Sequence, residues 1–235
     1  MNRSRRIVAA LALVVAGVLG TVVAQSAVTT AAAASAFPNG KNPVVLVHGF
    51  SGSGANWNTL KESLIATGYT SEQLTAISYG SYGQSNVDIA AVIGRTVDSV
   101  LAETGAAKVD IINHSMGGIN SRYCIKFDAC AGKVDHWISL AGANRGTYTA
   151  NLCSFFTPVC KEMVPGSALL KKLNAAPALP DGTKWSTLWS PNDGIIIPAE
   201  NTVLAGANNI QITGSHLGML KDAAVAAKVR ELLDS

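Results

Sequence analysis

Charged side chains are scarce in this chain. They make up 14% of its 235 residues, and aromatic side chains make up 6%. Lysine and arginine form no basic stripe, which argues against nucleic-acid binding. Histidine and cysteine occur four times each, and the sequence holds no Cys-x-x-Cys or His-x-x-x-His spacing that would suggest a zinc site. No internal repeat or linker divides the chain, so we expect one domain with a sizeable core.

The apolar run near the N-terminus is too broken for a typical membrane anchor. Arginines precede the run Ile7–Gly20, glycines interrupt it, and small residues follow as far as Ala34–Ala36. A basic start, an apolar centre and an Ala-x-Ala site predict a secretory signal peptide over residues 1–36. The domain then spans residues 37–235. The paired arginines also fit a twin-arginine signal in part, so the export route stays open.

Removal of residues 1–36 would leave a neutral chain. That segment holds three of the 18 Lys and Arg residues and none of the 15 Asp and Glu residues. All four cysteines lie in the remaining part, and an even number in an exported chain predicts disulfide bonds rather than free thiols. Pairing of Cys124 with Cys130 and of Cys153 with Cys160 is the simplest of the three possible connectivities.

Short apolar segments alternate with amphipathic segments along the rest of the chain. Strands are predicted over Pro43–Val47, Leu74–Tyr79, Val109–Asn113, Val134–Leu140, Lys184–Trp189 and Asn208–Ile212. Helices are predicted over Asn56–Thr67, Val87–Glu103, Met116–Phe127 and Lys221–Leu233. This alternation of apolar strands and helices predicts an α/β fold whose parallel sheet is covered on both faces. Functional residues are then expected on loops at the carboxyl ends of the strands.

The stretch Val109–Gly118, which reads V-D-I-I-N-H-S-M-G-G, carries the clearest chemical signal. A buried strand runs directly into a serine and restarts as a helix, and such a turn lifts the Ser115 hydroxyl out of the sheet. It resembles the nucleophile elbow Gly-x-Ser-x-Gly, with Asn113 in place of the first glycine. Because asparagine tolerates unusual backbone angles, we expect Asn113 to make a local hydrogen bond and Ser115 to remain a nucleophile.

A nucleophilic serine needs a base, which is usually a histidine. His216 follows the last predicted strand on a late loop, so we assign it as the general base. His48 ends the first strand. His114 neighbours Ser115, with its side chain expected to point away from the nucleophile, and His136 lies within a strand, where a structural or surface role is expected.

The carboxylate partner of the histidine is expected between Ser115 and His216 in the chain. Asp193 follows the fifth predicted strand in an Asn-Asp-Gly turn, which would present its carboxylate at the same edge of the sheet. The other candidates precede a strand or lie farther from a strand end; they are Asp128, Asp135, Glu162, Asp181 and Glu200.

Two backbone N–H groups are candidates for an oxyanion hole. One belongs to Met116, which follows the nucleophile at a helix N-terminus. The other belongs to Phe50, on the loop after the first strand, where Gly49 permits a tight turn.

With these residues in this order, the sequence from residue 43 onward resembles the small secreted bacterial triacylglycerol lipases of class 2, in the α/β-hydrolase superfamily. The matching stretches are Asn42–Phe50, Lys108–Ile111 with His114–Gly118, Ala141–Arg145, and Asn208–Ile212 with His216. The resemblance implies a three-layer fold with about six mostly parallel strands flanked by helices on both faces. It also implies hydrolysis of acylglycerol esters, no metal or other cofactor, and little or no lid.

The same resemblance carries a catalytic triad onto Ser115, Asp193 and His216, and oxyanion donors onto Phe50 and Met116. We accordingly expect an extracellular monomer that meets a lipid or ester substrate at an interface, without nucleic acid and without stable membrane insertion after signal removal. A short-chain esterase, a polyester hydrolase, a phospholipase or a transferase would use the same triad. A non-catalytic lipid-binding module could share the fold.

The connection over residues 146–180 is longer than a minimal lidless form needs. It carries apolar side chains that would line an acyl groove, form a partial lid, or pack as a cap over the core. These residues are Phe155, Phe156, Val159, Met163 and Val164.

Overall fold

The computed structural model describes residues 37–235, and the predicted signal peptide at 1–36 lies outside the described residues. Six strands form one sheet in the order β2-β1-β3-β4-β5-β6, with every neighbouring pair parallel. The strands are β1 (Val44–Val47), β2 (Leu74–Ala76), β3 (Val109–His114), β4 (Val134–Leu140), β5 (Lys184–Trp189) and β6 (Asn208–Gln211). The predicted α/β fold with a parallel sheet is confirmed.

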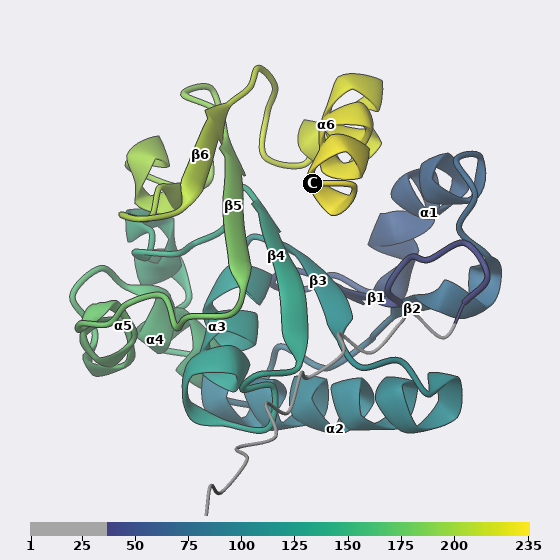
Figure 1. Ribbon diagram of the computed structural model, residues 1–235. Coiled ribbons are helices and arrows are strands. Elements are labelled where there is room, and N and C mark those ends of the chain that lie inside the picture. Colours follow the sequence, from purple (N-terminus) through teal and green to yellow (C-terminus); the bar gives the residue numbers. More distant parts are fainter. Residues whose placement is uncertain (1–36) are drawn as a thin grey trace, which may run out of the picture. The chain divides into compact units, whose positions relative to one another are not determined.

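Helices cover both faces of this sheet, which gives the fold its three layers (Figure 1). The helices are α1 (Asn58–Ile65), α2 (Asn86–Thr104), α3 (Gly117–Phe127), α4 (Pro158–Met163), α5 (Ala168–Asn174) and α6 (Ala223–Leu233). On one side α2 and α3 pack against the sheet, and on the other side α1 and α6 do. None of the helices within residues 37–235 has the length and apolar character that a bilayer crossing requires.

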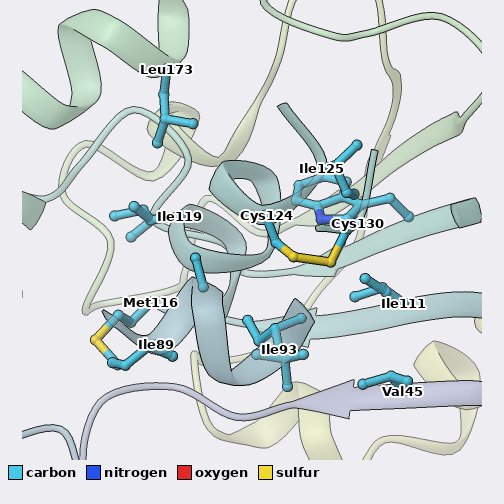
Figure 2. Close-up of a cluster of buried hydrophobic side chains, with 14 of the residues drawn as sticks. Val45, Ile89, Ile93, Ile111, Met116, Ile119, Cys124, Ile125, Cys130 and Leu173 are labelled. Carbon is cyan, nitrogen blue, oxygen red and sulfur yellow. A yellow bond between two sulfur atoms is a disulfide. The ribbon is translucent and has the colours of Figure 1, made fainter. Parts of the chain in front are cut away.

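The alternation of side chains along β1 explains why this strand is apolar at all four positions. Val45 and Val47 belong to the core beneath α2 and α3, whereas Val44 and Leu46 belong to the core beneath α1 and α6. Successive side chains of a strand point to opposite faces, so a strand that is covered on both sides favours apolar residues at successive positions. Figure 2 shows the first of these cores, where Ile93 of α2 lies near the strand residues.

Several predicted elements differ from the structure by one to three residues at their ends, and the cause is visible at two of them. The strand predicted over Leu74–Tyr79 stops at Ala76, because the Tyr79 N–H donates to the ring of His48 rather than to the sheet. As β2 is an edge strand, the chain can leave the ladder here at little cost. The last helix begins at Ala223 rather than at Lys221, and the Asp222 side chain caps it by accepting the Ala224 and Val225 N–H groups.

Two disulfide bonds each close a short loop of the chain. Cys124 at the end of α3 is bonded to Cys130, and Cys153 is bonded to Cys160 of α4. This is the local pairing that the sequence favours. Closing a loop this short stabilises the fold by about 2 kcal/mol, mainly by restricting the unfolded chain. The long connection after β4 is more regular than the sequence suggested, since it contains a 3-10 helix (Tyr148–Leu152), α4 and α5.

Candidate active site

Ser115 occupies the sharp turn between β3 and α3. Its φ of 56° lies in the left-handed region, which a non-glycine residue adopts only under constraint from its surroundings. The turn is this tight because α3 starts directly against β1: a Cβ on Gly117 would lie 2.6 Å from the Val47 carbonyl oxygen. The serine side chain therefore projects at the carboxyl end of the sheet, as in a nucleophile elbow.

The Ser115 hydroxyl lies in a continuous chain of hydrogen bonds. Its Oγ is 2.9 Å from His216 Nε2, and His216 Nδ1 is 2.9 Å from Asp193 Oδ2. These residues come from the ends of β3, β6 and β5 and are brought together because all strands of the sheet run in one direction. A backbone hydrogen bond of 2.9 Å from the His216 N–H to the Asp193 carbonyl joins the two loops. The tautomer with a proton on Nδ1 satisfies both contacts, leaving Nε2 to accept from serine.

The Asp193 carboxylate is held by its own turn. Its Oδ1 accepts the backbone N–H groups of Ile195 at 2.9 Å and Ile196 at 2.6 Å. Burial by itself would raise the pKa of this carboxyl. The hydrogen bond and charge of His216, together with the two backbone N–H groups, outweigh burial and hold the pKa below its usual range. Asp193 is thus an ionised acceptor facing His216.

The loop after β1 lies close against the serine. A Cβ on Gly49 would come within 2.7 Å of Ser115 Cβ, so glycine is required for this approach. Among residues 37–235, neither the Phe50 N–H nor the Met116 N–H has a hydrogen-bond acceptor. Two donors flanking the serine are therefore available to an oxygen atom bound there.

His48 holds this loop in place, a role that its position in the sequence did not reveal. Its Nδ1 donates to the Gly49 carbonyl at 2.7 Å, and its Nε2 accepts the Tyr79 N–H at 3.2 Å. The His48 ring also stacks on the Tyr79 ring, with centroids 3.9 Å apart. Burial lowers the pKa of His48, although the bond to Gly49 works against this. A neutral ring makes both contacts.

His114 contacts the histidine of the hydrogen-bonded chain. The rings of His114 and His216 are 4.5 Å apart, and His114 Nε2 donates to the His216 carbonyl at 3.0 Å. Burial, with the nearby His216, lowers the pKa of His114 to about 3, so this ring is neutral. The sequence indicated that the His114 side chain points away from Ser115, but it gave no sign of the contact with His216, which joins residues 102 positions apart.

Asn113 makes the local hydrogen bond expected of it. Its Nδ2 donates to the Ile138 carbonyl on β4 at 3.2 Å. Its Oδ1 is buried and has no hydrogen-bond partner within residues 37–235. The side chain therefore faces β4 beneath the elbow, away from the hydrogen-bonded chain above it.

Replacement of Asn113 with alanine is expected to leave kcat for ester hydrolysis within about twofold of the unsubstituted value. The loss of one buried hydrogen bond, worth about 1 kcal/mol, is offset by removal of an unpaired buried carbonyl. We therefore expect the free energy of unfolding to change by less than about 1 kcal/mol. Steady-state kinetics and urea denaturation measure the two quantities. A loss of kcat of tenfold or more would contradict this prediction and show that Asn113 helps to position Ser115.

Within the described residues, one cluster could supply three ligands to a metal ion: Asp110, Asp135 and His136. It lies where β3 and β4 begin, at the opposite end of these strands from Ser115. Its atoms already bond to one another, with His136 Nδ1 2.9 Å from Asp110 Oδ1. Burial would lower the pKa of His136, but Asp110 and Asp135 together raise it. The cluster joins the first residues of β3 to those of β4 and lies away from the candidate active site.

The long connection after β4 divides into a packed part and an exposed part. Val159 and Met163 are buried in the core, whereas Phe155 and Phe156 are 93% and 82% exposed. Neither a simple cap nor a closed lid describes the segment. Its first residues support the Asp193 loop, because Thr147 Oγ1 donates to the carbonyl oxygen of Ile195 at 2.7 Å. The sequence gave no signal for this threonine beyond its closeness to the matching stretch Ala141–Arg145.

Comparison with known proteins agrees with this geometry. The model of the class 2 lipase family matches residues 41–232. The mature form of a Bacillus licheniformis lipase superposes with a TM-score of 0.71 at 20% identity, over 82% of this chain and 92% of that one. Lipase B of Aspergillus fumigatus gives a TM-score of 0.71 at 17% identity, over 87% and 55% of the two chains. A phospholipase of Legionella pneumophila gives 0.68 at 18% identity, over 83% and 60%.

The structural likenesses establish the fold, because their sequence identities are low. The family match goes further, since it covers most of the chain and includes both the β1 loop and the turn at Ser115. The resemblance predicted from the sequence is thereby confirmed. The chain belongs to the class 2 lipase family and is an ester-hydrolysing enzyme.

Proposed function

We propose that the chain is a secreted triacylglycerol lipase with Ser115 as nucleophile, His216 as general base and Asp193 as the carboxylate that orients His216. The observation that carries the proposal is the chain of two 2.9 Å contacts from Ser115 Oγ through His216 to Asp193. The Asp193 carboxylate supports the proposal, because it is ionised and is fixed by two backbone N–H groups. In this state it would stabilise the imidazolium of His216 that forms during the reaction.

The reaction would proceed in two halves. As Ser115 Oγ attacks the ester carbonyl carbon, its proton passes to His216 Nε2, and the Phe50 and Met116 N–H groups stabilise the negative oxygen. His216 then gives the proton to the departing alcohol, which leaves an acyl group on Ser115. A water molecule, deprotonated by His216, attacks this acyl group and releases the fatty acid.

Secretion is supported by the residues on both sides of the proposed cleavage site. Residues 1–36 have the pattern of a signal peptide, and the described domain holds two disulfide bonds, which persist in oxidising compartments. We infer that cleavage follows Ala36, that residues 37–235 form one catalytic domain, and that this domain acts as a monomer.

The acyl specificity of this site is tested with esters of increasing chain length. We expect hydrolysis of triolein and of p-nitrophenyl esters with long acyl chains, because apolar side chains such as Ile195 and Leu217 are exposed beside Asp193 and His216. Initial rates, measured by fatty-acid titration and by nitrophenol release, give the profile. A sharp optimum at acetate or butyrate without triolein hydrolysis would contradict the lipase assignment and favour a short-chain esterase.

A further inference from the structure

The most exposed large apolar side chains stand at the end of the sheet that carries Ser115. Leu152, Phe155 and Phe156 follow β4 and are 84%, 93% and 82% exposed. Tyr82 follows β2, and Leu217 follows β6. Monomeric soluble proteins rarely expose apolar side chains together in this way unless the surface has a partner.

This apolar surface is continuous with the candidate active site. Leu217 directly follows His216, and the Tyr82 ring lies 5.3 Å from the ring of Phe50, whose N–H is the proposed oxyanion donor. The 3-10 helix that leads to Leu152 is joined to the Asp193 loop by a hydrogen bond from the Tyr148 N–H. A partner that covers these side chains would therefore meet the opening above Ser115.

The loops at this end of the sheet carry almost no charge. Lysine, arginine, aspartate and glutamate are absent from residues 42–60, 73–87, 146–160 and 201–220. Recognition of an anionic membrane depends on clustered lysine and arginine, so these loops do not suit one. An uncharged apolar partner fits them, because these four ranges hold no ionised group that would have to lose its hydration on contact.

The two phenylalanines are presented on a fixed turn. The disulfide Cys153–Cys160 closes the turn, and the Cys153 carbonyl accepts the N–H groups of both Phe156 and Thr157. A hollow of about 1070 Å³ lies beside this turn. The two rings line it together with residues of α4 and α5, and their high exposure shows that they are not packed into the core. Ordering of the turn before contact lowers the entropy cost of binding.

We propose that the turn Leu152–Phe156, together with Tyr82 and Leu217, docks the enzyme onto an uncharged acylglycerol–water interface with Ser115 facing the lipid. This inference rests on the proposed lipase function and identifies the surface through which the enzyme reaches its substrate. The aromatic rings enter the apolar phase, and the uncharged loops around them lie against it.

Flotation with triolein droplets stabilised by gum arabic tests the proposal. The purified protein carries Ser115→Ala, so that the lipid is not consumed. In this background we expect Phe155→Ser/Phe156→Ser to lower the partition coefficient by about tenfold or more, because two exposed rings no longer transfer from water to lipid. Partition should be insensitive to added salt. Ile65→Ser is the matched control, since Ile65 is 45% exposed on α1, away from these loops, and should not affect partition.

A fluorescence measurement gives a second readout at the turn itself. Phe155→Trp should be quenched by brominated triolein beyond the quenching of the parent protein, which holds four tryptophans. Equal partition of the double variant and its parent would overturn the proposal. The proposal would also be overturned if Ile65→Ser lowered the partition coefficient as much as the double variant does. Salt-sensitive binding to phosphatidylglycerol vesicles in preference to triolein would overturn it as well.

The docking proposal and the lipase proposal fail in different ways. Hydrolysis of soluble p-nitrophenyl butyrate by the unsubstituted protein does not require an interface, so its absence would count against the catalytic proposal alone. If the soluble ester is hydrolysed while Phe155→Ser/Phe156→Ser leaves partition unchanged, the catalytic proposal stands and the docking surface is wrong.

Discussion

Replacement of Ser115 with alanine is expected to lower kcat for ester hydrolysis by on the order of 10⁵-fold to 10⁶-fold. The hydroxyl lies 2.9 Å from His216 Nε2, and an acyl-enzyme cannot form without its oxygen. Nitrophenol release from a p-nitrophenyl acyl ester measures the loss. Because serine and histidine act as one unit, adding His216→Ala to Ser115→Ala should lower kcat little further.

Covalent labelling separates this expectation from a loss of folding. A serine-directed phosphonate should add its mass to the Ser115 peptide of the unsubstituted protein and leave Ser115→Ala unlabelled, while both proteins keep the same circular dichroism spectrum. Retained hydrolysis by Ser115→Ala would falsify the nucleophile assignment. If the unsubstituted protein takes up no label and hydrolyses no ester, a non-catalytic lipid-binding role becomes the better interpretation.

Replacement of Asp193 with asparagine is expected to lower kcat on the order of 10⁴-fold. The asparagine carbonyl oxygen would take the place of Oδ1 against the Ile195 and Ile196 N–H groups. Its NH₂ group would then face His216 Nδ1, where two donors cannot pair. His216 would shift its proton to Nε2, which faces Ser115 and would lose its ability to accept the serine proton. Steady-state kinetics with a soluble ester give the change in kcat.

A second buried His–Asp pair in the same sheet supplies the control. Asp110 and His136 are also 2.9 Å apart, but at the ends of the strands where the chain enters the sheet. Asp110→Asn is expected to lower the free energy of unfolding by about 1–3 kcal/mol and to leave kcat within about twofold. If Asp110→Asn reduced kcat as strongly as Asp193→Asn, the loss would reflect general destabilisation, and Asp193 would have no special role.

Much of the fold could be predicted because both faces of its sheet are covered. Full burial favours apolar residues on both faces of a strand, as at all four positions of Val44–Val47, and such a run is visible in a sequence. The ends of elements were less certain, since β2 stops where the Tyr79 N–H finds the ring of His48. That bond joins residues 31 positions apart, so no local sequence pattern predicts it.

The candidate site was predictable for a topological reason. In a parallel sheet, residues that follow strands meet at one edge, so Ser115, Asp193 and His216 could be proposed from their order and positions alone. The supporting contacts could not be foreseen. The neutral ring of His114 against His216, and Thr147 beneath the Asp193 loop, depend on distances between separate loops.

The sequence by itself determined the α/β class, the tight turn at Ser115 and the choice of the residues proposed for catalysis, because each follows from local patterns repeated at strand ends. Only the tertiary structure decided what Asn113 bonds to, which histidines are held neutral, and which of residues 146–180 are buried or exposed. Val159 and Phe155 are both apolar in a cysteine-bearing loop, yet one is buried and the other faces water. That difference arises because α4, which carries Val159, packs against α2 and α5, and α2 lies far from α4 in the chain.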